Sequence, residues 1–220
     1  MGLRVEYPEL GKRRGVTVAD FLGPTEAKCQ ARPILNTLIS SYQKQFEQGR
    51  HPRLPQGLIK RSFGLRHYCT YLHSHFQEGG QLVVVQDETV QGEINAFCTT
   101  SYAHRVLGGG YDGCYLKDVV AFPHRSGLGS LVMHAALKFG QFKPDDAVVL
   151  HAFKGSKVNG WYERHHIKLD PTASPEQYEF DADHRLPLVT HRTPDSYYLG
   201  DVIQSLEKRY PHLIDGEPVL

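Results

Sequence analysis

The stretch CYLKDVVAFPHRSGLGSLVMHAALKF, residues 114–139, decides how the rest of this chain is interpreted. Residues 114–122 favour a strand, residues 123–126 form a turn, and the sequence continues through Gly127 and Gly129 into a helical pattern. The apolar residues at spacings of three and four share one face of that helix: Leu128, Leu131, Val132, Ala135 and Phe139. His134 and Lys138 are expected on other faces of the helix.

A glycine-rich turn between a strand and a helix is suited to holding a phosphate. The first N–H groups of the helix have no partners within it, and the helix dipole is positive at this end. Glycines also let a diphosphate come close to the main chain, which a Cβ would prevent. A tight turn without a ligand is the alternative for this stretch taken alone.

A second motif follows the apolar run Ala147–Phe153, which has the length of a buried strand. With YERHHI at residues 162–167, the order of motifs resembles the GCN5-related N-acetyltransferase (GNAT) superfamily. HRSGLG at residues 124–129 stands where that superfamily has [Arg/Gln]-x-x-Gly-x-[Gly/Ala], and YERHHI stands where it has a pattern like Tyr-Glu-Lys-x-Gly-Phe. His124 and His166 depart from these patterns, which have Arg or Gln at the first place and Gly at the second.

The resemblance implies an α/β (α+β) fold with a mixed, mostly antiparallel central sheet of six to seven strands flanked by helices. The fourth and fifth strands, residues 114–122 and 147–153, are expected to run parallel and to splay apart, so that an acyl-thioester arm enters between them. A single domain over residues 1–220 is expected. It would have a solvated lead-in over residues 1–15 and an extra C-terminal helix over residues 195–210, capped by Asp195.

Hydrophobic periodicity and turn residues predict the remaining elements. Strands are expected at residues 16–22, 81–86, 92–101 and 186–190, the last in a hairpin with residues 178–180. Helices are expected at residues 31–48 and 58–76, and a loop at residues 104–113. The second of these helices has Cys69 and His73 one turn apart. A zinc site needs further ligands, so we expect no metal and interpret its histidines as polar residues near a substrate cleft.

The resemblance also implies acetyl-CoA as the co-substrate and assigns residues to it. Backbone groups of the splayed strand would pair with the pantetheine amides, and the turn and helix start would hold the diphosphate. The residues implied for acetyl-CoA binding are Val119, Val120, Ala121, His124, Arg125, Ser126, Gly127, Leu128, Gly129, Ser130 and Asn159. Asn159 is included because Gly155 stands where the superfamily often has an Asn, seven residues before the Tyr.

Catalysis by direct transfer needs a proton for the departing thiolate and a base for the attacking amine. Tyr162 is the candidate for the proton donor, since the superfamily has a Tyr with this role at the matching place. The alternative is that Tyr162 is an aromatic residue packed beside Trp161. For the base, Asp118 is the first candidate, Glu93 the second and His151 the third, and some relatives use only water.

The sequence therefore predicts an N-acetyltransferase that moves an acetyl or other acyl group from acetyl-CoA to a primary amine, in a small molecule or a protein, within a ternary complex. One alternative is an acyl-CoA-binding module without catalysis. Another is a toxin-type acetyltransferase acting on aminoacyl-tRNA, with Arg61, Arg66 and Arg105 as candidate phosphate contacts. A formal net charge of +1 gives no global reason to expect a nucleic-acid partner.

Composition sets the remaining expectations. The 220 residues suffice for a sizeable core, and the four cysteines form no Cys-x-x-Cys pair. No apolar run approaches the roughly 20 residues of a membrane helix. We expect a cytoplasmic protein with reduced thiols and no membrane partner. The extra C-terminal helix could cover the sheet edge, shape the acceptor site or support a homodimer.

Overall fold

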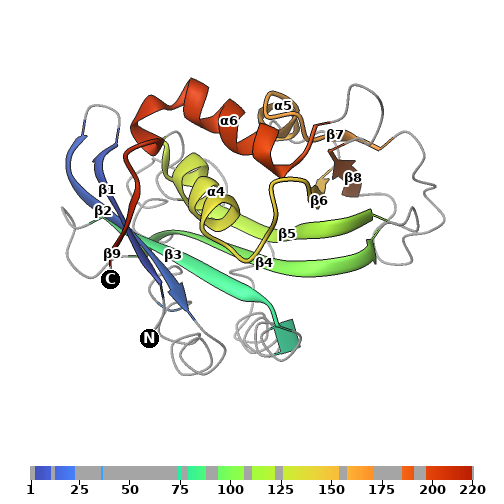
Figure 1. Cartoon of the computed structure of the whole chain (residues 1–220), viewed down its shortest axis with the longest axis horizontal. Helices are drawn as coiled ribbons and strands as arrows, with labels where there is room; N and C mark the ends of the chain where they lie inside the picture. The colour runs from blue at the N-terminus through green and yellow to red at the C-terminus, as the bar shows by residue number, and fades with distance from the viewer. Residues whose placement is uncertain are drawn as a thin grey trace.

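A single sheet organises the computed structural model, which describes residues 3–10, 13–22, 36, 74–75, 79–87, 94–106, 111–121, 126–153, 158–170, 185–190 and 197–219 (Figure 1). Its strands are β1 (Arg4–Leu10), β2 (Arg13–Leu22), β3 (Gln81–Asp87), β4 (Ile94–Val106), β5 (Tyr111–Ala121), β6 (Ala147–Phe153), β7 (Lys168–Leu169), β8 (Arg185–Val189) and β9 (Glu217–Val219). Their order across the sheet is β7-β8-β6-β5-β4-β3-β2-β1-β9.

The sheet confirms the predicted mixed, mostly antiparallel architecture. β5 and β6 are parallel, and the other neighbouring strands run antiparallel. Seven of the nine strands have five or more residues, in agreement with the six to seven expected. The two short strands, β7 and β9, extend the sheet at its two edges.

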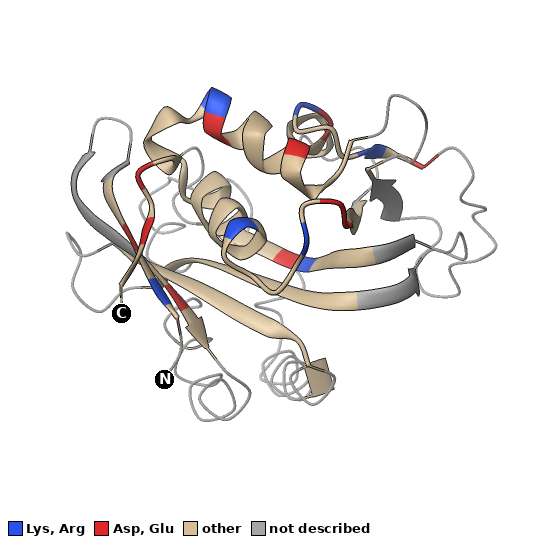
Figure 2. Cartoon of the chain, in the orientation of Figure 1, with Lys and Arg blue, Asp and Glu red and all other residues tan. Residues whose placement is uncertain are grey.

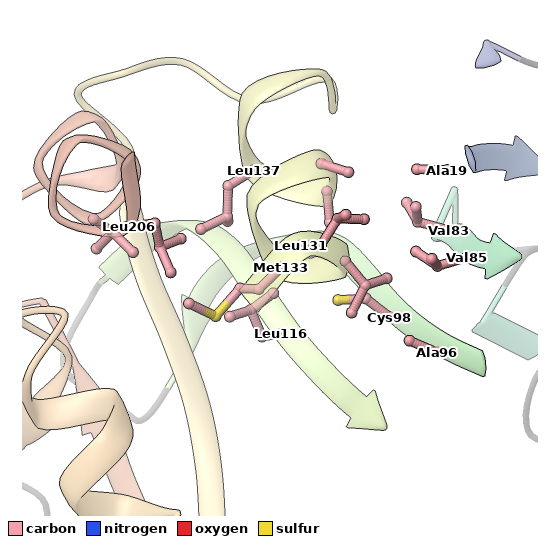
Figure 3. Close-up of a cluster of buried hydrophobic side chains, with 14 of the residues drawn as sticks. Ala19, Val83, Val85, Ala96, Cys98, Leu116, Leu131, Met133, Leu137 and Leu206 are labelled. Carbon is pink, nitrogen blue, oxygen red and sulfur yellow. The ribbon is translucent and has the colours of Figure 1, made fainter. Parts of the chain in front are cut away.

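The helix α4 (Leu128–Lys138) covers one face of the sheet and supplies much of the core. Figure 3 shows Leu131 and Met133 of α4 in one cluster with strand residues that include Val83 and Cys98. Each large side chain buried here contributes on the order of 2 kcal/mol to the free energy of folding. The helix α6 (Leu199–Arg209) packs against α4, and its Leu206 belongs to the same core cluster.

The remaining helical segments are short. They are α5 (Asn159–Glu163), which follows β6, and the 3-10 helix η2 (Pro211–Leu213), which follows α6. Figure 2 shows charges of both signs interspersed on the helices. None of the helices in the described part of the chain has the length and apolar composition that crossing a bilayer requires.

The predicted lead-in over residues 1–15 is wrong, because β1 occupies most of it and pairs with both β2 and β9. Val5 and Tyr7 are fully buried, and they alternate with the less buried Arg4 and Glu6. This period of two is typical of a strand with one buried face. The basic residues around position 13 belong to β2, which starts at Arg13 instead of residue 16.

The C-terminal helix begins at Leu199, later than the predicted residue 195. Its start is fixed by backbone bonds from Leu199 N to Asp146 O and from Gly200 N to Pro144 O, both 2.9 Å long. The carboxylate of Asp201 accepts the Tyr198 N–H at 2.7 Å, so Asp201 has the capping role predicted for Asp195. Asp195 lies outside the described residues.

Other boundaries also differ from the sequence predictions. β4 extends to Val106 and β5 starts at Tyr111, so most of the predicted loop at residues 104–113 is strand. β8 pairs with β7, directly after α5, whereas the predicted partner at residues 178–180 lies outside the described residues. The helices predicted at residues 31–48 and 58–76 also lie outside them, except for Asn36, Ser74 and His75, which are helical.

His134 was expected on another face of its helix than the apolar residues, and it is fully buried there. The Tyr7 hydroxyl lies 3.1 Å from its Nδ1, and its Nε2 lies 3.0 Å from the Glu207 carboxylate on α6. Lys138 also binds this carboxylate, at 2.7 Å. Burial lowers the pKa of His134, against the opposing effect of its bond to Glu207. A helical wheel could not anticipate this, because α6 and β1 cover the face that the pattern leaves polar.

Candidate active site

The parallel strands β5 and β6 are paired over only part of their length. Pairing runs from Gly113 with Ala147 to Leu116 with Leu150. Beyond these pairs β5 continues to Ala121 beside β4, and β6 continues to Phe153 beside β8, but the two strands are no longer paired with each other. The sheet therefore opens at the place where the sequence predicted a splay, and we call this opening the fork.

A bulge in β5 lies at the start of the fork. Thr100 pairs with Leu116 while its neighbour Thr99 pairs with Asp118, which leaves Lys117 as the extra residue. A bulge bends a strand and changes the face on which the following side chains lie. Beyond it, Val119, Val120 and Ala121 are partly exposed and are paired with β4 alone, so their main chain on the β6 side borders the fork.

The start of α4 follows the fork in sequence. Gly127 precedes the helix with a φ of +86°, a left-handed conformation that favours glycine. A helical bond joins Leu131 N to Gly127 O at 3.1 Å, so the N–H groups of residues 128–130 precede the regular bonds of the helix. The Leu128 N–H donates to Ser126 Oγ at 3.4 Å. His124 and Arg125 lie outside the described residues.

The described residues around Gly129 leave room for a side chain at this position. A Cβ built there would meet only the Ala121 Cβ, at an ordinary contact distance of 3.6 Å, and its φ is not in the left-handed region. A helix normally gains stability when such a glycine becomes alanine. The glycine is therefore compatible with a main chain that a ligand approaches closely.

Leu128 and Ser130 were both assigned to the cofactor, but their side chains contact the protein. Leu128 is fully buried in the core. Ser130 is also buried, with 4% of its surface exposed. Neither side chain is therefore positioned to bind a ligand. Asn159 is partly buried at the start of α5.

Tyr162 lies in the core on α5, with 8% of its surface exposed. Burial raises the pKa of its phenol well above the usual range, and the Cys98 thiol and the Asp118 carboxylate raise it further. The phenol therefore keeps its proton at neutral pH and acts as a hydrogen-bond donor. The centroid of its ring lies 4.9 Å from that of Trp161. The ring therefore packs beside Trp161, as the alternative interpretation of Tyr162 predicted.

Two of the three candidate bases are described. Asp118 accepts a hydrogen bond from the Thr99 hydroxyl at 2.9 Å. His151 Nδ1 lies 2.8 Å from the hydroxyl of Tyr115 on β5, so this pair bridges the two strands beside the last pairs before the fork. The third candidate, Glu93, lies outside the described residues.

Asp118, Tyr115 and His151 share the face of the sheet that is opposite α4. The core residues beneath α4 include Cys114, Leu116, Val148 and Leu150, so alternation places Tyr115 and His151 on the other face. Val119 pairs with Cys98 and packs on that core, which places Asp118 on the opposite face too. Sequence reasoning missed Tyr115, because its partner is 36 residues away on another strand.

His166, which stands where the superfamily pattern has glycine, has a backbone conformation that glycine usually adopts. His166 is the one non-glycine residue with a positive φ, 66°, in the described part of the chain. Bonds from His166 N to Glu163 O and from Ile167 N to Tyr162 O form the helix ending known as a Schellman motif, which usually has glycine at this place. The His166 ring stacks on Tyr197, with centroids 3.9 Å apart, and this contact offsets part of the backbone strain.

Comparisons with known proteins were made at the levels of sequence and structure. A scan against protein-family models found no match, and a search of curated proteins found none either. Among solved structures, apo FdhC, a nucleotide-linked sugar GNAT, is 8% identical, with 90% of this chain and 94% of that chain covered and a TM-score of 0.52.

Further solved structures have similar descriptions. A protein from Bordetella pertussis described as a GNAT-family acetyltransferase is 15% identical, with 79% of this chain and 94% of that chain covered and a TM-score of 0.51. Naa50 from Arabidopsis thaliana, solved with the bisubstrate analogue CoA-Ac-MVNAL, is 12% identical over 79% of this chain and 98% of that chain, with a TM-score of 0.45. The chain has the fold of the GCN5-related N-acetyltransferases, as the resemblance of its motifs predicted.

Proposed function

We propose that this protein is an acyltransferase that moves an acetyl group from acetyl-CoA to a primary amine by direct attack. The observation that carries the proposal is the fork, where β5 and β6 lose their pairing after Leu116 and Leu150. An extended ligand arm can pair with the main chain of Val119–121 there, as an added strand would. The start of α4 follows directly and offers N–H groups to a diphosphate.

The acyl group would be held in the fork so that its carbonyl carbon faces the amine. The amine nitrogen forms a bond to this carbon, and the carbon–sulfur bond breaks as the intermediate collapses. Tyr162 donates a hydrogen bond to the departing sulfur, along which the thiolate takes up its proton. The attacking amine loses its proton to a base on the opposite side of the sheet from α4.

Asp118 and His151 are the bases that the described structure offers on that face. An alkyl amine is almost fully protonated at neutral pH, so one of these groups or a water bound to it must accept a proton. The pH dependence of kcat/KM separates them. Loss of the rising limb of the profile in His151→Gln would assign the base to His151, and its loss in Asp118→Asn would assign the base to Asp118.

Calorimetric titration with acetyl-CoA and with CoA is the first test, followed by a thiol-release assay over a panel of small amines and peptide amines. We expect binding of both nucleotides and thiol release with at least one amine. Binding without release on any acceptor would favour a cofactor-binding module. Failure to bind either nucleotide would remove the proposal.

A further inference from the structure

The helix α5, which carries Tyr162, is too short to hold its position alone. It has five residues, and Val158 at its start makes no side-chain capping bond. Isolated helices shorter than about 12 residues are marginal in water. The orientation of Tyr162 therefore depends on contacts between this part of the chain and other elements.

The main chain of Tyr162 is bound to the residues that follow α5. Its carbonyl oxygen accepts the N–H groups of His165 at 2.9 Å and of Ile167 at 3.1 Å. Both of these residues are fully buried. A shift of residues 165–167 would therefore move Tyr162 with them.

One hydroxyl of α6, that of Ser205, holds this segment at two points. Ser205 Oγ donates to the carbonyl oxygen of Arg164 at 3.3 Å and lies 3.1 Å from Nδ1 of His165. A serine hydroxyl has a single hydrogen, so it accepts the second bond and His165 Nδ1 carries the proton. We call these two bonds the Ser205 contact.

The Ser205 contact orients the ring of His165. The other ring nitrogen, Nε2, is buried and has no hydrogen-bond partner among the described residues. The ring lies edge-on to that of Trp161, with centroids 5.4 Å apart, so it packs beside the residue that precedes Tyr162. Burial lowers the pKa of His165, so the ring is neutral at pH 7 and keeps this pattern of bonds.

The helix α6 is itself fixed on α4. Glu207 of α6 binds His134 at 3.0 Å and Lys138 at 2.7 Å, and both of these residues belong to α4. In Figure 1, α6 runs above α4 and also passes close to α5. The Ser205 contact therefore ties α5 to the helix whose first turn offers N–H groups to a diphosphate.

We propose that Ser205 and His165 are positioning residues for Tyr162, which deepens the proposed function and rests on it. A proton donor contributes fully only when its hydrogen points at the departing sulfur, and small errors in such geometry are costly. The Ser205 contact fixes the main chain of Tyr162 and the place of α5 on the core. Neither positioning residue needs to touch the substrate.

Ser205→Ala in the full chain tests the proposal, because it removes the hydroxyl at a helical position that alanine favours. We expect single-turnover thiol release to slow three- to tenfold, about the value of one hydrogen bond. Acetyl-CoA affinity, measured by calorimetry, should stay within about twofold of that of the original protein. Ser205→Thr keeps a hydroxyl and should release thiol at a rate within about twofold of the original.

A double variant separates positioning from a general loosening of the site. Ser205 acts through Tyr162, so Ser205→Ala should change the rate by less than about twofold when it is added to Tyr162→Phe. Loosening of the site would slow the reaction in both backgrounds. Lys138→Ala is the control, because it removes a bond between α6 and α4 and leaves the Ser205 contact in place. It should leave the rate within about twofold.

Two results would overturn the inference and leave the proposed function standing. One is an unchanged rate of thiol release in Ser205→Ala. The other is an equal loss in Ser205→Ala whether or not the Tyr162 hydroxyl is present. If the original protein binds no acetyl-CoA, or releases no thiol with any amine, the proposed function and the inference fail together.

Discussion

The two ends of the β5–β6 pair are built differently. At one end Gly113 lies so close to the main chain of Ala147 that a Cβ would come within 2.2 Å of its carbonyl oxygen. At the other end the bulge at Lys117 ends the pairing, and half-buried residues and polar side chains border the fork. One pair of strands can therefore be closely packed at one end and open to a ligand at the other.

The largest expected effect is at the paired end. Gly113→Ala places a Cβ against backbone atoms of Ala147, at a φ of +156° that L side chains rarely adopt. We expect a loss of about 3 kcal/mol or more in the free energy of unfolding, measured by urea denaturation. Gly160→Ala is the control, because a Cβ there meets only the Arg164 guanidinium at 3.8 Å. A loss below about 1 kcal/mol in Gly113→Ala would contradict the close approach of β5 and β6.

The next effect concerns the chemistry near the open end. Tyr162→Phe keeps the packed ring and removes the buried hydroxyl. We expect turnover to fall about ten- to a thousandfold, with acetyl-CoA affinity nearly unchanged, the range for a lost proton donor. Stopped-flow thiol release and calorimetry measure the two quantities separately. Unchanged turnover would leave Tyr162 with a packing role only.

A smaller effect is expected from pH, through His165, which follows α5. Burial, with Arg209 and Arg164 nearby, lowers the pKa of His165 to about 4. The unfolded chain therefore binds a proton near pH 6.5 that the folded protein does not bind until about pH 4. Stability should fall over this interval by on the order of 2 kcal/mol. His165→Asn should flatten this slope in denaturation curves recorded between pH 7 and pH 4.5, and an unchanged slope would contradict the assignment.

The smallest effect is expected in the first turn of α4, where a substitution should weaken ligand binding without lowering stability. Gly129→Val adds a branched side chain where the described structure has one contact, at 3.6 Å. We expect roughly tenfold weaker binding of acetyl-CoA, with the free energy of unfolding changed by less than about 1 kcal/mol. Gly129→Ala is the control and should retain affinity within about threefold. Full affinity in Gly129→Val would argue against a diphosphate at this turn.

The central part of the fold could be predicted from sequence because its signals are local. The run Ala147–Phe153 is a strand with the predicted bounds, and the helix predicted after Gly127 begins at Leu128. β1 was missed because Lys12 and its basic neighbours suggested a solvated segment, although Val5 and Tyr7 already alternate with charged residues. The prediction gave more weight to the basic residues than to this short alternation of apolar and charged residues.

The candidate site was predictable only in part, since several contacts join distant residues. The motif patterns located Gly127 and Tyr162, and the position of His166 took the left-handed conformation that glycine usually adopts. The pairs of Tyr115 with His151 and of His165 with Ser205 depend on which strands and helices become neighbours. The sequence of one chain does not contain that information locally.

The pairing of β9 with β1 has a consequence for the order of folding. Arg4 lies opposite Val219, so these partners come from opposite ends of the described chain. Closing so long a loop is slow, while the hairpin of β4 and β5 joins near neighbours in sequence. We expect hydrogen exchange to show late protection at Val5 and early protection at Cys98, so that the outermost strand pair is the last part of the sheet to assemble.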